Sequence, residues 1–111
     1  MVKTYNLQKV AGDSENIEVT VVDEEGTAVD LTGASIEYAI KTTVEAVTNE
    51  LLLTTADFSI TILANVFSIA VSPNDTVSLN GTYYHECEIT LADGRVFTAF
   101  SGSIFISPTG V

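Results

Sequence analysis

Hydrophobic and polar side chains alternate along five separate stretches of this chain, and this period of two limits the fold more than any other feature. The alternating stretches run over residues 17–21, 36–40, 58–62, 67–71 and 83–91. In an extended chain successive side chains point to opposite faces, so each stretch gathers its apolar residues on one face. Val, Ile, Thr, Tyr and Phe, which fill these stretches, favour strands. The pattern predicts antiparallel strands with one buried side and one solvent-facing side.

Short turn signals separate the stretches. We predict strands over residues 3–10, 16–23, 34–42, 50–55, 57–63, 66–71, 82–91 and 95–106. Asp93 and Gly94 predict a hairpin turn, because glycine accepts the positive φ that such turns need. Gly102, inside the last strand, indicates a bulge. Ser72 and Pro73 are typical of a helix start, and we expect this helical turn to end near Gly81, the left-handed exit.

Many short strands with closely spaced turns are typical of a β-sandwich or a small barrel. Leu79, Gly81 and Tyr83 lead into a long strand, and this arrangement resembles the tyrosine corner of immunoglobulin-like sandwiches. We therefore predict an all-β fold, an Ig-like antiparallel β-sandwich of about seven or eight strands with one short helical turn before the penultimate long strand. We expect residues 1–111 to form a single domain, with residues 1–10 as an edge strand or docking arm.

Composition excludes several classes of protein. Asp and Glu number 15 and Lys and Arg number 4, so the net charge is −11. Four cations cannot form the basic surface of a nucleic-acid-binding protein. The hydrophobic fraction of 46% is too high for a disordered acidic tail. No apolar run reaches the roughly 18 to 20 residues of a membrane helix. From the few cations we expect no nucleic-acid partner, and from the missing apolar run we expect no membrane partner.

Cysteine usage and the N-terminal residues bear on the compartment. Cys87 is the only cysteine, which excludes an intrachain disulfide. The N-terminal residues lack the apolar run of a signal peptide, so we expect synthesis in a cytoplasm.

Two candidate sites share the long strand over residues 82–91. His85 and Cys87 fall on one face, where they could act as a general base or as metal ligands, but a structural zinc site needs four ligands. A buried histidine and a buried thiol are the simpler interpretation. Glu86 and Glu88 share the other face with Tyr84, and such a pair could hydrolyse a sugar only across a cleft. A solvated strand face is the simpler interpretation here too.

Two further motifs lie in predicted turns. Asp23, Glu24, Glu25 and Asp30 could bind calcium, but they lack the alternating acids of a calcium loop and fit a solvated hairpin tip better. Residues 80–82 read Asn-Gly-Thr, a glycosylation acceptor that matters only in a secreted chain. With one His, one Cys and one Arg, the chain has too few groups for nucleophilic or phosphoryl-transfer chemistry. We therefore predict no catalytic residues, no cofactor and no metal site.

The order of turns and strands also resembles a known family. The segments that carry the resemblance are residues 11–14, 21–34, 75–86, 91–96 and 101–106. They are similar to Ig-like modules of tailed-phage structural proteins, nearest in kind to the N-terminal domain of baseplate upper proteins and to small tail or head accessory proteins. The resemblance covers about residues 10–107, although residues 43–59 lack the glycine-rich turn that the family has there.

This resemblance implies a virion structural protein without catalytic residues. Its expected partners are other virion proteins and, for self-association, further copies of the chain, and its expected location is the virion after synthesis in the host cytoplasm. A mean hydropathy of +0.33 in a chain this short also favours buried interfaces. The alternative is an Ig-like adhesin or carbohydrate-binding module, with Tyr5, Tyr84 or Phe100 as an exposed aromatic platform.

Overall fold

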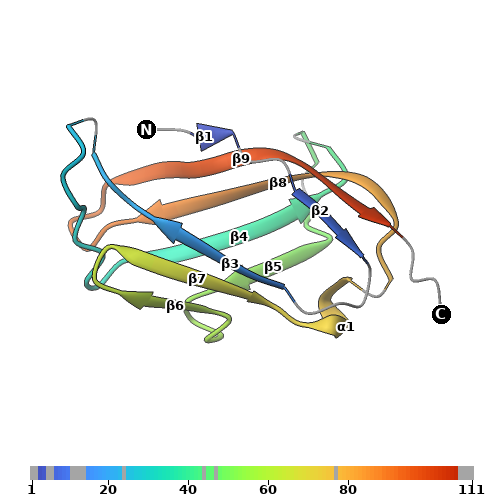
Figure 1. Cartoon of the computed structure of the whole chain (residues 1–111), viewed down its shortest axis with the longest axis horizontal. Helices are drawn as coiled ribbons and strands as arrows, with labels where there is room; N and C mark the ends of the chain where they lie inside the picture. The colour runs from blue at the N-terminus through green and yellow to red at the C-terminus, as the bar shows by residue number, and fades with distance from the viewer. Residues whose placement is uncertain are drawn as a thin grey trace.

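The described part of the chain folds into two packed β-sheets (Figure 1). The computed structural model describes residues 3–4, 7–10, 15–23, 25–43, 45–46, 48–76 and 78–107. The smaller sheet has the order β3-β7-β6, from strands β3 (Glu15–Thr20), β7 (Val66–Val71) and β6 (Ile60–Leu63). The larger sheet has the central order β9-β8-β4-β5, from strands β9 (Val96–Ser107), β8 (Gly81–Thr90), β4 (Ser35–Lys41) and β5 (Leu51–Thr54).

All pairings among these seven strands are antiparallel. Three strands face four in the arrangement of an immunoglobulin sandwich, with β3, β7 and β6 in the places of strands B, E and D, and β4, β8 and β9 in those of C, F and G. The prediction of an all-β, Ig-like sandwich is confirmed.

The N-terminal residues add to the larger sheet along its β9 edge. Strands β1 (Lys3–Thr4) and β2 (Leu7–Val10) both pair with β9 in parallel, with Lys3 opposite Phe100 and Leu7 opposite Ile104. The predicted strand over residues 3–10 is therefore two short strands in the described part of the chain. Their parallel direction differs from the antiparallel pairing that the period of two predicts for the other strands.

The short helix α1 (Pro73–Thr76) connects the two sheets between β7 and β8. Our prediction that this turn ends near Gly81 was wrong, because the helix ends at Thr76 and Gly81 is the first residue of β8. Gly81 does have the predicted positive φ, +110°. It uses this conformation to enter a strand rather than to leave a helix.

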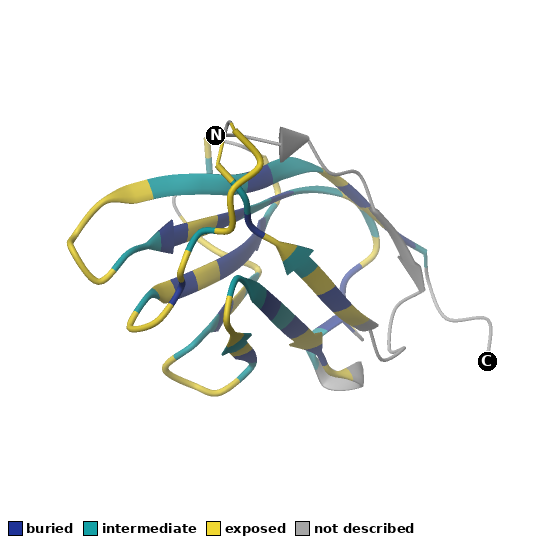
Figure 2. Cartoon of the chain, turned by 60° about the vertical axis from the view of Figure 1, so that its left-hand side comes forward, coloured by how far each residue is buried: buried dark blue, intermediate teal, exposed yellow. Residues whose placement is uncertain are grey.

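The core lies between the sheets, where buried and exposed residues alternate along the strands (Figure 2). Its largest fully buried side chains include Tyr38, Phe67, Ile36, Ile40, Ile69 and Ile89. Each buried aliphatic or aromatic side chain of this size contributes about 1.5–3 kcal/mol relative to exposure. Ala39, which the alternation predicts to face solvent, is only 8% exposed. Its methyl group is small, and the cross-strand neighbours Leu52 and Glu86 flank it.

A bulge interrupts the long β8–β9 pair, but at a different place from the one predicted. Cys87 pairs with Phe100 while Glu88 pairs with Thr98, so Ala99 is the extra residue. Gly102 stays in register opposite His85, and the prediction of a bulge there was wrong. One extra residue reverses which side chains face the core. Phe97 and Phe100 therefore face inward together, and Phe100 is only 2% exposed.

Candidate functional site

The turn before β8 holds the three residues of the predicted tyrosine corner. The Tyr83 hydroxyl donates a hydrogen bond to the Asn80 carbonyl at 3.2 Å and accepts one from the Asn80 backbone N–H at 3.1 Å. Leu79 is buried in the core beside this turn. A bond from a tyrosine at the start of strand F to the backbone a few residues upstream is the defining contact of a tyrosine corner. The Asn80 side chain of the glycosylation motif is exposed here.

Asp93 and Gly94 lie at the tip of the β8–β9 hairpin. Gly94 has a φ of +93°, and its N–H donates to the Leu91 carbonyl at 2.9 Å. Asp93 accepts the Arg95 backbone N–H at 3.0 Å and pairs with the Arg95 guanidinium, Nε to Oδ2, at 2.9 Å. These bonds hold the hairpin tip in one conformation and place Arg95 beside it.

His85 and Cys87 are both fully buried in the core. The His85 Nδ1 atom shares a hydrogen bond of 2.8 Å with the Tyr38 hydroxyl. Burial, with a smaller contribution from the nearby Glu88 charge, raises the pKa of the Cys87 thiol to about 12. The thiol therefore stays protonated at neutral pH, which is unsuited to a nucleophile or a metal ligand.

The ring of His85 forms a compact cluster with the rings of Tyr38 and Phe100. Its imidazole packs edge-on against Tyr38, with centroids 5.6 Å apart, and against Phe100, with centroids 5.5 Å apart. In antibody domains the residue two after the corner tyrosine is a disulfide cysteine, and strand C supplies a buried Trp. Here His85 takes the cysteine position, and Tyr38 comes from β4, the counterpart of strand C. A hydrogen-bonded aromatic cluster thus fills this part of the core.

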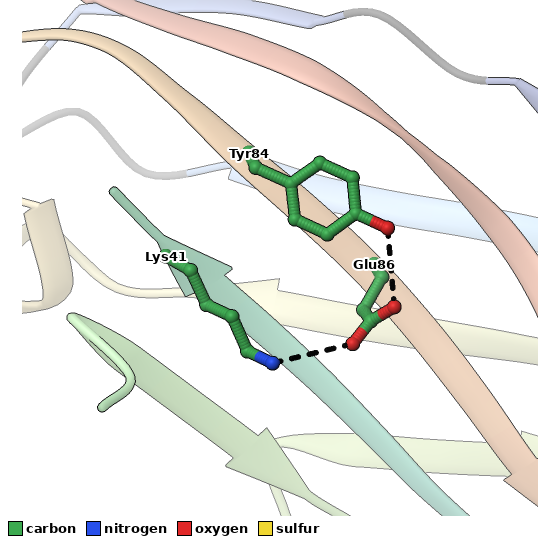
Figure 3. A network of polar contacts seen from close by, with 3 residues as sticks. All are labelled: Lys41, Tyr84 and Glu86. Carbon is green, nitrogen blue, oxygen red and sulfur yellow. Dashed lines mark hydrogen bonds and ion pairs between the residues drawn. The ribbon is translucent and has the colours of Figure 1, made fainter. Parts of the chain in front are cut away.

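The outer face of β4 and β8 carries the predicted carboxylate pair, and Figure 3 shows one of the two, Glu86, with its partners Lys41 and Tyr84. Glu86 accepts a hydrogen bond from the Tyr84 hydroxyl at 3.2 Å and pairs with the Lys41 ammonium at 3.5 Å. Partial burial and the Glu86 charge raise the pKa of Tyr84. Glu88 is exposed and lies directly opposite Glu37 on β4. The two predicted glutamates share the outer face of the sheet, where both line a hollow of about 180 Å³.

The acidic residues after β3 stabilise a small turn. A bridge between Val22 and Ala28 closes the turn, and Asp23 Oδ1 accepts the backbone N–H groups of Glu25 and Thr27, each at 2.9 Å. Glu24 lies outside the described residues. Among the residues that the structure does describe, no three His, Cys, Asp or Glu side chains could hold a metal ion together. The carboxylate of Asp23 therefore serves the turn.

A groove of about 820 Å³ opens between this turn and the β8–β9 hairpin. The half-buried apolar residues Val29, Leu91 and Phe97 line it, together with the exposed residues Asp23, Glu25, Asp30 and Arg95. Both loops lie at the same end of the sandwich, on the left in Figure 1. In antibody variable domains the equivalent loops, B–C and F–G, contribute to the binding site.

The sequence pattern does not predict the exposure of two apolar side chains. Phe58, in the turn between β5 and β6, is 84% exposed and has a φ of +66°. Leu63, at the β6–β7 turn, is 81% exposed. The period of two assigns Phe58 to a strand and to its buried face, so the pattern concealed its exposure. A positive φ at a residue other than Gly, Asn or Asp has no sequence signature.

Of the three residues of the predicted aromatic platform, Phe100 was predicted wrongly, because it is buried. Tyr84 lies half-buried on the outer face, and Tyr5 lies outside the described residues. No protein-family model matches the chain, and no curated protein shows significant sequence similarity to it. Within the described residues, no helix has both the length and the hydropathy needed to cross a membrane.

Proposed function

We propose that this chain is a structural subunit of a tailed-phage virion, made in the host cytoplasm and assembled into the tail, baseplate or head–tail region. It acts without catalysis, through contacts with neighbouring virion proteins and with further copies of itself. The resemblance of residues 10–107 to phage Ig-like modules and the sandwich fold support this assignment. One structural observation carries it, the conformation of Phe58.

Phe58 is exposed although its conformation is unfavourable. A left-handed backbone costs a residue with a Cβ atom about 1–2 kcal/mol. With 84% of the residue in solvent, little burial offsets that cost within this chain. Strained residues persist where surrounding structure holds them and are common at functional sites. An outward aromatic ring is the kind of side chain that anchors protein interfaces.

The turn around Phe58 is held by its neighbours. Asp57 Oδ1 accepts the Ser59 N–H at 2.8 Å, and the Asp57 N–H donates to the Thr54 hydroxyl at 3.2 Å. The Phe58 N–H donates to the Thr55 carbonyl at 3.2 Å. These bonds hold the backbone of the turn in the conformation that exposes Phe58 before any partner binds, which lowers the entropy cost of association.

Incorporation of variants into phage particles tests this proposal. Phe58→Ala removes the ring and keeps the strained backbone, whereas Phe58→Gly removes the ring and also relieves the strain. If the ring contacts a neighbouring subunit, both variants enter purified particles in fewer copies than the wild-type chain does. Wild-type incorporation of both folded variants would contradict the contact role of Phe58.

The carbohydrate-binding alternative requires an exposed aromatic platform. Burial of Phe100 removes one of the three side chains on which that alternative depends. The Tyr84 hydroxyl is engaged with Glu86.

A further inference from the structure

We infer that the groove between the turn after β3 and the β8–β9 hairpin binds a segment of another protein that presents a Lys or Arg beside aliphatic side chains. This inference rests on the proposed function and deepens it, because it gives the chemistry of one partner. Three features of the groove carry it: the floor, the rim and the pairing of its arginine.

The apolar residues that line the groove, which we call its floor, are only partly covered. Val29, Leu91 and Phe97 are half-buried, and Val96 at the edge is 56% exposed. Two of these residues come from β9 and the others from the loops at the two sides of the groove. Aliphatic side chains of a partner would remove this surface from water, which is favourable in proportion to the area covered.

The acidic residues that line the groove all come from the loop between β3 and β4, and we call them its rim. Asp30 Oδ1 accepts two hydrogen bonds, from the Thr32 hydroxyl at 2.7 Å and from the Thr32 N–H at 3.0 Å. These bonds lower the pKa of Asp30, so its carboxylate is ionised throughout the neutral range. Asp23 and Glu25 line the same side. The backbone bonds to Asp23 keep its carboxylate in place.

Among the described residues, Arg95 is the one cation that lines the groove, and it is already paired. Arg95 Nε lies 2.9 Å from Asp93 Oδ2 within the hairpin. Three acidic residues and one arginine thus line the groove, and the arginine is already paired with a fourth carboxylate, that of Asp93. A cationic partner segment complements this charge, whereas an acidic segment is repelled. The chain's net charge of −11 also attracts a cationic segment from a distance.

The contact surface extends beyond the groove at this end of the sandwich. Val21 N–H donates to the Asn65 carbonyl at 2.8 Å, and Leu31 N–H donates to the Ala64 carbonyl at 3.3 Å. These bonds join the β6–β7 turn to the loop that forms one wall. The exposed Leu63 therefore lies at the same end and can add an apolar contact to a partner seated in the groove.

A peptide-display selection tests the inference without a known partner. The probe is a random library of 12-residue peptides, selected on the folded wild-type chain and then synthesised for affinity measurements. We expect enriched peptides to carry Lys or Arg flanked by Leu, Ile or Val. In Glu25→Gln/Asp30→Asn, binding should weaken about tenfold, because two rim charges are lost while an amide can still accept the Thr32 bonds.

A matched control removes the same charge elsewhere. Glu37→Gln/Glu88→Gln takes two carboxylates from the outer face of β4 and β8, so it should change peptide affinity by less than about twofold. Raised salt should weaken binding to the wild-type chain. Enrichment of acidic peptides, no enrichment, or equal losses in the two double variants would overturn the inference. None of these outcomes bears on Phe58 or on presence in particles, so the proposed function is tested separately.

Discussion

The hydroxyl of Tyr38 and Nδ1 of His85 lie 2.8 Å apart at the centre of the sandwich, and both side chains are fully buried. They join β4 to β8, the adjacent strands that pair from Ser35 to Lys41. Antibody domains place part of a disulfide and a Trp in this region. This chain has one cysteine, and the hydrogen-bonded pair of Tyr38 and His85 occupies the same region of the core. The pair links the core-facing sides of the two strands.

The Tyr38–His85 hydrogen bond should contribute measurably to stability. Tyr38→Phe keeps the ring and removes the hydroxyl, and we expect the free energy of unfolding in urea to fall by about 1–3 kcal/mol, because a buried polar atom loses this bond. Tyr84→Phe is the control, since its hydroxyl lies on the partly exposed outer face, where the loss should be under about 1 kcal/mol. Equal losses in the two variants would show that the buried hydrogen bond contributes no more to the free energy of unfolding than the bond on the outer face.

Backbone strain at Phe58 predicts an order of stability among variants. Phe58→Gly should melt at a higher temperature than Phe58→Ala, by the equivalent of about 1 kcal/mol, because only glycine adopts the left-handed conformation without strain. Ala64→Gly, at a φ of +56°, should also raise the melting temperature. Differential scanning calorimetry measures both. A lower melting temperature for Phe58→Gly than for Phe58→Ala would contradict the strain.

Cys87 should be unreactive in the folded protein. Its pKa of about 12 leaves almost no thiolate at pH 8, and its side chain is fully buried. A chromogenic disulfide reagent should label the native chain only as fast as the chain opens, and should label it at once in concentrated urea. Because the chain has a single cysteine, the signal reports this position alone. Rapid labelling without denaturant would place the thiol at the surface.

Acid should weaken the turn that presents Phe58. Hydrogen bonds from Ser59, chiefly from its backbone N–H, lower the pKa of Asp57 below its ordinary value of 3.8. The carboxylate thus stabilises the fold fully above that value, and the contribution is lost as pH falls through the lower pKa of the folded state. Between about pH 5 and pH 2, the free energy of unfolding should fall more for the wild-type chain than for Asp57→Asn. Parallel curves would refute this linkage.

The period of two and the turn residues predicted most strands, because burial on one face dictates their pattern. The error at Phe100 has a specific cause. Ala99 is an extra residue in β9, and every side chain after it changes face. Alanine carries no signal for a bulge, whereas Gly102 carried a misleading one. One inserted residue is therefore enough to reverse the predicted facing of the side chains that follow it in the strand.

The parts of the groove were visible in the sequence, but their proximity was not. Asp23 and Asp30 were predicted in one turn, and Asp93 and Gly94 in another. Only the sandwich topology brings these turns to one end, more than 60 residues apart in the chain. The partner of His85 was also hidden, because the register that sets Tyr38 opposite Cys87 depends on strand pairing over a long separation.

Quantitative mass spectrometry of purified phage particles tests the central claim most directly. The particles would be banded by density and washed, and peptides of this chain would be counted against those of the major tail and capsid proteins. We predict a fixed, whole-number ratio of this chain to other structural proteins in every preparation. Absence of the chain from infectious particles, or a ratio that falls with each wash, would contradict its role as a virion subunit.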